Sequence, residues 1–295
     1  MSRWKLHLLG VERMADAGGK PIGVPDICWP LVGSLLAMPD RSASRAALAD
    51  ELWRDSPDDA TARHRLGTAV WRVRTRLPPF ESALTSAGDR LALQLDGNLW
   101  IDALAFEARV EAALSDRSLL AAASERHRLR RVLTLYQGDF LAGRDHEAIA
   151  IERERLRSLF IDGAFALASA EARSGNWAGA RDAAKRLCGV EPLREDGQRL
   201  LIEAYAACGS RGLAIRQYRL LQQVLAEELG VAPMAETRQL AERVSGGSLE
   251  PEPLAAQAVE IGGPWSWRSN FRHTLISTRD QISRVIALLD DPPAS

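Results

Sequence analysis

Cysteine is scarce in this 295-residue chain. Cys28, Cys188 and Cys208 lie far apart, without CxxC or Cys/His ligand spacing, which excludes a disulfide framework and a zinc site. Each is expected to be a small buried apolar residue. No apolar run approaches the roughly 18 residues of a membrane span, and no secretory signal pattern opens the chain. We therefore expect a soluble cytoplasmic protein without a metal or a membrane contact.

Catalytic and nucleotide-binding motifs are also missing. The five histidines are scattered, and neither HExxH nor GxSxG occurs. The run ADAGGKP has Pro21 where a phosphate-binding loop needs Ser or Thr, and Met14 where that loop begins with glycine. We interpret it as a turn. The sequence predicts no catalytic residues, no enzyme activity and no cofactor.

A general excess of positive charge is absent as well. The formal net charge is −1, and residues 1–100 carry thirteen Lys and Arg against twelve Asp and Glu. The run TARHRLGTAVWRVRTRL, residues 61–77, nevertheless holds five arginines, with no acid between Ala60 and Phe80. Positive charge is therefore a local feature of this segment.

The first hundred residues show the order of a winged helix-turn-helix. WKLHLLG (4–10) predicts a strand, and GGKPIGVP (18–25) a turn and a second strand. Helical spacing follows over 29–38, 45–53 and 61–77, with Ser42 or Ser44 as the cap of the second helix. Two prolines end the third helix, and SALTSAGDRLALQL predicts a hairpin around Gly88-Asp89.

The third predicted helix has one apolar face and one face bordered by arginines, at about 100° per residue. The core face comprises Leu66, Ala69, Val70, Val73 and Leu77. The opposite face comprises His64, Thr68, Trp71 and Thr75. One border carries Arg65, Arg72 and Arg76, and the other carries Arg63, Gly67 and Arg74.

This distribution predicts a helix that lies in the major groove of DNA. Phosphates flank such a helix on both sides and base edges lie in front of it, so arginines suit the borders and polar groups the centre. Arg90 on the predicted wing would reach the minor groove. The alternative is that the arginines solvate an exposed face, which the lack of acids at i,i+4 disfavours. For Trp71, a contact with DNA and a contact with the wing or a partner subunit remain equal alternatives.

Several runs resemble a known family. LADELWRDSPDDATARHRLGTAVWRVRTRL and LTSAGDRLALQLDGNLWIDALAFE look like the DNA-binding domain of the SARP/AfsR class of bacterial transcriptional activators. YQGDFLAG, IERERLRSLF, EPLREDGQRLLIEAY and QYRLLQQVLAEELGVAP resemble, in order and spacing, the bacterial transcriptional activator domain of that class. The resemblance covers about residues 3–244 and implies binding to direct repeats beside a promoter, as a homo-oligomer, and recruitment of RNA polymerase.

The second half also predicts helical repeats. Gly175 and Gly209, like Ala180 and Ala214, are 34 residues apart, which is the tetratricopeptide period. Such helix pairs stack into a solenoid that commonly binds protein. We expect Tyr136, Phe160, Tyr205 and Tyr218 in its core, and ERERLR (152–157) as a solvated helix face, although the same run in the family lies at the junction of the two domains.

The predicted fold is mainly α with a small β part. It has a winged helix-turn-helix over 1–100, a tetratricopeptide-like helical domain over 101–245, a linker over 246–264 and an amphipathic helix over 265–295. This last helix either covers the solenoid or contacts a second subunit or the polymerase. The predicted function is sequence-specific activation of transcription. The alternative is a helical-repeat scaffold whose winged helix mediates protein–protein contacts.

Overall fold

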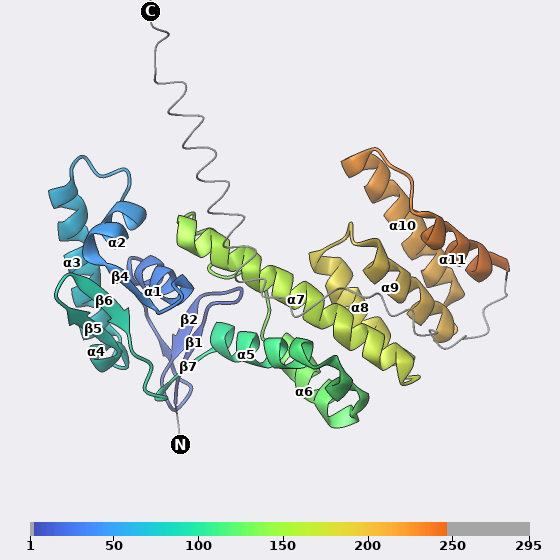
Figure 1. The fold of residues 1–295 in the computed structure, drawn as a ribbon, viewed down its shortest axis with the longest axis horizontal. Coiled ribbons are helices and arrows are strands. Elements are labelled where there is room, and N and C mark those ends of the chain that lie inside the picture. Colours follow the sequence, from blue (N-terminus) through green and yellow to red (C-terminus); the bar gives the residue numbers. More distant parts are fainter. Residues whose placement is uncertain (1–2, 247–295) are drawn as a thin grey trace, which may run out of the picture. The chain divides into compact units, whose positions relative to one another are not determined.

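The computed structural model describes residues 3–246. A four-stranded sheet near the N-terminus has the order β3-β2-β1-β7, in which β1 runs parallel to β7 and the other pairs are antiparallel (Figure 1). Its strands are β1 (Trp4–His7), β2 (Arg13–Ala15), β3 (Pro21–Ile22) and β7 (Leu99–Ile101). The sequence predicted β1 and β3, whereas the three-residue strands β2 and β7 show too little alternation to be recognised.

A three-helix unit and a second sheet follow in the predicted order, which confirms the winged helix-turn-helix. The helices are α1 (Cys28–Ala37), α2 (Arg45–Leu52) and α3 (Asp59–Arg76), followed by the short α4 (Phe80–Ala83). The sheet has the order β4-β6-β5, with β4 (Ser42–Ser44), β5 (Leu84–Ala87) and β6 (Arg90–Leu93). Side-chain caps fix two helix starts, because Ser44 Oγ accepts from Ala47 N at 3.1 Å and Asp58 Oδ1 accepts from Thr61 N at 2.7 Å.

The predicted core face of α3 is confirmed. Its apolar side packs toward α1 and α2. All five predicted side chains are at most 4% exposed, namely Leu66, Ala69, Val70, Val73 and Leu77. Because this stripe is buried, the opposite face of α3 must point away from the three-helix core.

The regular elements of the second half are helices. Its elements are α5 (Asp102–Ser115), the 3₁₀ helix η1 (Arg117–Ala121), α6 (Ala123–Leu133), α7 (Glu147–Arg173), α8 (Trp177–Val190), α9 (Glu195–Ala207), α10 (Arg211–Leu229) and α11 (Ala235–Gly246). Consecutive helices from α7 to α11 pack on one another. Gly246, predicted to open the linker, ends α11, and the rest of the predicted linker and C-terminal helix lies outside the described residues.

The 34-residue repeat is visible in the backbone. Gly175 and Gly209 follow the ends of α7 and α9 with φ values of 76° and 75°, a left-handed conformation that suits glycine. Their amides donate to Ala172 O and Ala206 O, which are also 34 residues apart. The same turn therefore joins the two helices of each of two successive pairs, as the tetratricopeptide spacing predicted.

The buried aromatic and cysteine predictions hold in part. Tyr136 and Phe160 are 4% and 1% exposed, and their rings stack with centroids 4.5 Å apart. Tyr205 and Tyr218 are only half-buried, because they lie beside the small cluster that α9, α10 and α11 form near the end of the described chain. Cys28 and Cys188 are buried as predicted, whereas Cys208, which directly follows α9, is half-buried.

The prediction of a solvated face for ERERLR is wrong. Arg153 donates to the carbonyls of Phe140, Leu141 and Arg144 at 2.9, 2.8 and 2.7 Å. The side chain of Arg155 is only 14% exposed and pairs with Glu107 and Glu152. The segment lies in the first part of α7, which packs on α1, α5 and α6, so most of its charges bridge neighbouring elements, and only Glu154 is exposed.

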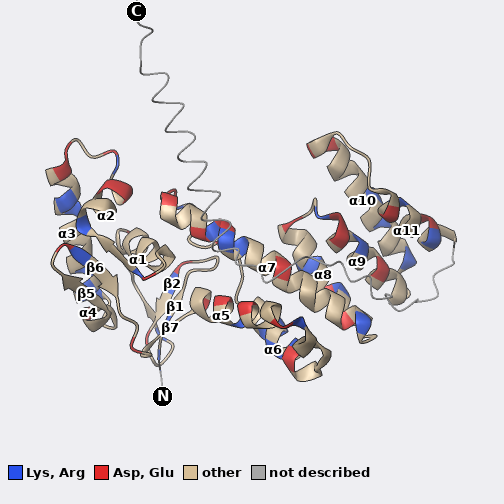
Figure 2. Ribbon diagram, viewed as in Figure 1, with Lys and Arg blue, Asp and Glu red and all other residues tan. Residues whose placement is uncertain are grey.

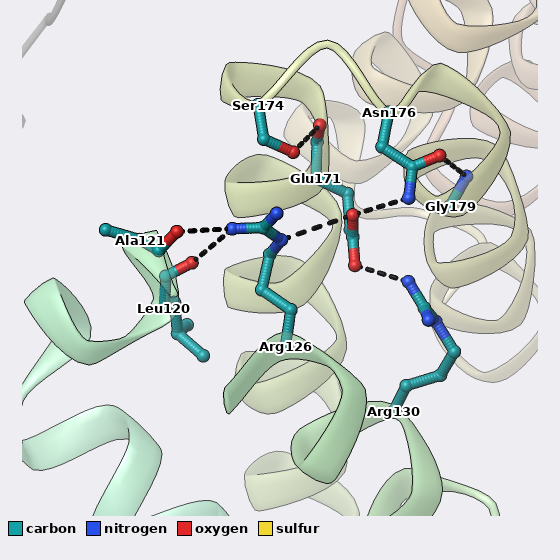
Figure 3. Close-up of polar contacts among 8 residues, drawn as sticks. All are labelled: Leu120, Ala121, Arg126, Arg130, Glu171, Ser174, Asn176 and Gly179. Atoms are coloured by element: carbon teal, nitrogen blue, oxygen red, sulfur yellow. Dashed lines mark hydrogen bonds and ion pairs between the residues drawn. The ribbon is translucent and has the colours of Figure 1, made fainter. Parts of the chain in front are cut away.

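A buried carboxylate, Glu171, joins three elements of the helical half (Figure 3). It is 1% exposed and forms ion pairs with Arg126 and Arg130 of α6. Asn176, the cap of α8, donates Nδ2 to Glu171 Oε2 at 2.7 Å. Arg126 also donates to the carbonyls of η1. One side chain of α7 thus fixes α6 and the start of α8.

The winged helix and the helical half share one hydrophobic core. Gly33 of α1 faces the helical half so closely that a Cβ there would lie 2.1 Å from Leu141 Cδ1. Glu51 of α2 accepts from Ser34 Oγ at 3.2 Å and from the Ala148 amide in the first turn of α7 at 3.0 Å. These contacts join α1 and α2 directly to α7.

Asp102 ties the first strand to the start of α5. It is 1% exposed, and its carboxylate accepts from the amides of Leu8 at 2.9 Å, Leu9 at 3.2 Å and Ala103 at 2.7 Å. Burial raises the pKa of the Asp102 carboxyl to about 6 despite these donors. The folded protein therefore holds a proton here at pH values where the unfolded chain has released it.

This difference predicts a pH effect on stability. Because the folded pKa of Asp102 is the higher one, its contribution to the free energy of unfolding rises as pH falls from about 6 to about 4, by up to about 3 kcal/mol. The gain should be missing in Asp102→Asn. Denaturation of the protein with Asp102 and of the Asp102→Asn variant across this range measures the gain. Both proteins should carry His7→Gln, because His7 Nδ1 lies 3.6 Å from Asp102 Oδ2 and His7 has a pKa of its own that burial and Arg13 lower. Parallel pH profiles would refute the effect.

Candidate nucleic-acid interface

The face of α3 opposite the core is accessible. Of the nine predicted contact residues on α3, seven are exposed, namely Arg63, His64, Arg65, Trp71, Arg72, Thr75 and Arg76. Thr68 and Arg74 are half-buried. Figure 2 shows basic residues at several places along α3. The structure therefore leaves most of the predicted surface open.

One border of α3 carries unpaired cations. Within residues 3–246, the side chains of Arg72 and Arg76 form no hydrogen bond or ion pair. Arg65 makes one long contact, from Nη1 to Ser56 Oγ at 3.4 Å. Three guanidinium groups on this side of the helix are thus free or nearly free to meet an anion.

The other border differs from the expectation. Arg63 lies 3.7 Å from Asp59, an i,i+4 ion pair of two exposed side chains, so acid partners are not wholly absent from α3. Asp59 lies one residue before the acid-free run begins at Ala60, in the first turn of the same helix. An exposed pair of this kind is worth little, so Arg63 can exchange it for another anion.

Arg74 is engaged with the wing. It donates Nε and Nη2 to Leu84 O at 3.0 and 2.8 Å, and Nη2 also to Ser86 Oγ at 2.9 Å. Leu84 and Ser86 belong to β5, so Arg74 fixes the angle between α3 and the wing. No local sequence signal marks this role, because the carbonyl that it binds is 10 residues away.

Arg90 and the wing turn are held in place as well. Arg90 Nη2 donates to Ser42 Oγ at 2.5 Å and lies 3.3 Å from Asp40 Oδ2, so its side chain is directed onto β4. The Arg45 amide at the start of α2 donates to Asp89 O at 2.7 Å. Gly88, with φ of 59°, forms the left-handed position of the turn. Arg90 would have to leave Ser42 and Asp40 to reach DNA.

A shallow groove beside α3 was not foreseen. It is lined by Gly67, Val70, Trp71, Arg74, Thr75, Pro78 and Glu81. Thr75 donates its hydroxyl to Trp71 O at 2.8 Å, which removes that proton from base recognition. Pro78 and Glu81 are beyond the end of α3, so helical periodicity within α3 could not assign them to its surface.

The described residues contain no helix that is both long and apolar enough to cross a membrane. The same residues contain no group of three or more His, Cys, Asp or Glu side chains suited to hold a metal ion.

Comparison with known proteins bears on both halves. The family model of the bacterial transcriptional activator domain matches residues 101–245. Regulatory protein AfsR of Streptomyces coelicolor is 28% identical over 227 residues, which are 77% of this chain and 22% of AfsR. Regulatory protein AfsR of Streptomyces griseus is 30% identical over 218 residues, which are 72% of this chain and 22% of that protein. The chain thus spans about a fifth of the length of these curated relatives.

A solved structure shares the fold. Mycobacterium tuberculosis EmbR, in complex with a low-affinity phosphopeptide, superposes with a TM-score of 0.66 at 24% identity, over 84% of this chain and 66% of the EmbR chain. At this identity the likeness shows the fold alone. The matched domain and the AfsR relatives carry the assignment to a family of transcription regulators. The chain belongs to the SARP/AfsR class of bacterial transcriptional activators.

Proposed function

We propose that this protein binds promoter DNA through α3 and activates transcription through its helical half. The observation that carries the proposal is the exposed face of α3, where Arg72 and Arg76 have no partner within residues 3–246. A guanidinium group without a partner is planar and weakly hydrated, and its parallel N–H groups match the oxygens of a phosphate. His64 and Thr68 lie between the two borders, where base edges would face them.

The wing supports this placement of α3. Arg74 fixes β5 against the helix, and Arg45 fixes the wing turn against the start of α2. A wing that is held at a set angle can follow a backbone beside the major groove, so its entropy cost on binding is small. In this arrangement Arg74 positions the wing, and Arg63, Arg65, Arg72 and Arg76 grip phosphates or guanines.

The helical half is proposed to recruit RNA polymerase. Stacked helix pairs present extended surfaces that commonly bind protein. The shared core and the contact between Glu51 and the Ala148 amide hold this half firmly on the winged helix. A polymerase contact on the solenoid would thus be set at a fixed position relative to the bound promoter. Binding of a homo-oligomer to direct repeats and location in the cytoplasm complete the proposal.

Replacing the two unpaired arginines should weaken DNA binding. For Arg72→Ala/Arg76→Ala we expect each lost phosphate contact to reduce the slope of log affinity against log salt concentration by about 0.9. The slope of the double variant should therefore be smaller by about two. The affinity should fall by about 1–3 kcal/mol for each arginine that contacts a base or phosphate. Titration of the full chain with selected promoter duplexes at several salt concentrations measures both quantities.

Arg216→Ala provides the matched control. Arg216 is an exposed arginine of α10, and its loss should leave the affinity and the salt slope unchanged. Equal effects of the α3 and α10 variants would indicate non-specific attraction. If the full chain binds no duplex from a random library at low salt, the scaffold function, in which the winged helix contacts protein, replaces the proposal.

A further inference from the structure

The groove beside α3 has apolar walls at an accessible place. Trp71 is 58% exposed and lies one helical turn from both Gly67 and Thr75. A Cβ built on Gly67 would meet nothing within 4 Å, so this position adds open space next to the indole. Pro78 continues the wall beyond the end of α3. The exposed indole thus borders a hollow large enough for a small group.

Two of the polar side chains that line the groove are already engaged. Arg74 donates to Leu84 O and Ser86 Oγ, and the Thr75 hydroxyl donates to Trp71 O. Apart from the Glu81 carboxylate, what remains for a ligand is the indole, the Thr75 methyl group and the Pro78 ring. These surfaces favour an apolar group, because burying such a group needs no hydrogen-bond partner.

Glu81 offsets the charge of Arg74 in the same groove. Both side chains line the groove, and the partners of Arg74 are neutral, so a phosphate that entered would gain no net charge attraction from the groove itself. Arg72 and Arg76 on the opposite border of α3 still attract a polyanion as a whole. The occupant that satisfies both conditions is an uncharged apolar group carried by a nucleic acid. In the major groove of DNA this group is the C5 methyl of thymine.

We propose that the groove formed by Gly67, Trp71, Thr75 and Pro78 receives the C5 methyl group of a thymine and so selects a T·A pair at one position of the binding site. This inference rests on the proposed function, since it requires α3 to lie in the major groove. Trp71 then acts as a specificity-determining residue, whereas the border arginines that contact phosphates supply affinity that does not depend on sequence.

Removal of single methyl groups from DNA tests the inference. A duplex selected from a random library by the full chain is resynthesised with each thymine replaced in turn by deoxyuridine, which pairs identically but lacks the methyl group. We expect one such replacement per half-site to weaken binding roughly four- to tenfold, as for loss of one buried methyl group. In Trp71→Ala the same replacement should change affinity less than twofold.

Two further variants sharpen the test. Gly67→Val fills the hollow at an exposed helical position and should also abolish the sensitivity to deoxyuridine. Val11→Ala truncates a side chain that is 78% exposed outside α3 and should leave the sensitivity intact.

The failures are distinguishable. Sequence-specific binding without any deoxyuridine-sensitive position would overturn the inference and leave DNA binding standing. Sensitivity that persists in Trp71→Ala would overturn it too. If Trp71→Ala changes the number of chains per duplex without changing the sensitivity, Trp71 contacts a partner subunit and not a base. Failure to bind any duplex would overturn the proposed function itself.

Discussion

Glu171→Gln should lower the free energy of unfolding by about 4 kcal/mol, because the substitution leaves a buried cation without its counter-charge. The side chain of Arg126 is only 11% exposed, and Glu171 is its one acidic partner within residues 3–246. Glutamine retains the size of the side chain and one acceptor oxygen, so the loss reports the charge and not a cavity. Chemical denaturation followed by circular dichroism measures it.

Glu147→Gln is the matched control. Glu147 is on the same helix as Glu171 and forms an exposed ion pair with Arg54, in which the two side chains are 69% and 72% exposed. Loss of this pair should lower the free energy of unfolding by less than about 1 kcal/mol. In an Arg126→Met background the effect of Glu171→Gln should shrink, since most of the unpaired charge is then gone. An undiminished loss in that background, or equal losses for Glu171 and Glu147, would contradict the assigned role.

Phe160→Ala should lower the free energy of unfolding by about 4 kcal/mol, because it truncates a large buried side chain. The ring is 1% exposed, stacks on Tyr136, and lies under the guanidinium of Arg186, whose Cζ is 5.2 Å from the ring centroid. Its removal leaves a cavity between α7, α8 and the segment before α7, which a helix of 27 residues cannot close by a small shift. Equilibrium denaturation of the full chain provides the measurement.

The comparison variants separate burial from side-chain type. Tyr205→Ala removes a half-buried aromatic and should cost clearly less, and Leu220→Ala, at a side chain that is 51% exposed, should stay within about 0.5 kcal/mol. Because both halves share a core, hydrogen exchange at α1 should accelerate together with that at α8 in Phe160→Ala. Unchanged protection of α1 would show that the winged helix unfolds independently.

The sequence by itself determined the features that depend on neighbours within one or two helical turns. The core stripe of α3 and the 34-residue spacing of Gly175 and Gly209 follow from local rules of helix geometry and left-handed turns. For the cap of α2 the sequence left Ser42 and Ser44 as alternatives, and the structure selects Ser44. The pair of Arg63 with Asp59 is equally local and could have been found by extending the search into the first turn of α3.

Only the tertiary structure decided which charges are free. Arg74 and Arg72 look alike in sequence, yet Arg74 binds the wing, whereas the side chain of Arg72 forms no hydrogen bond or ion pair within residues 3–246. The partners of Arg153 and of Glu171 likewise come from other elements. Helical periodicity fixes the direction in which a side chain leaves its own helix, but the packing of other elements determines what it meets there, and these elements lie at sequence separations that no local pattern records.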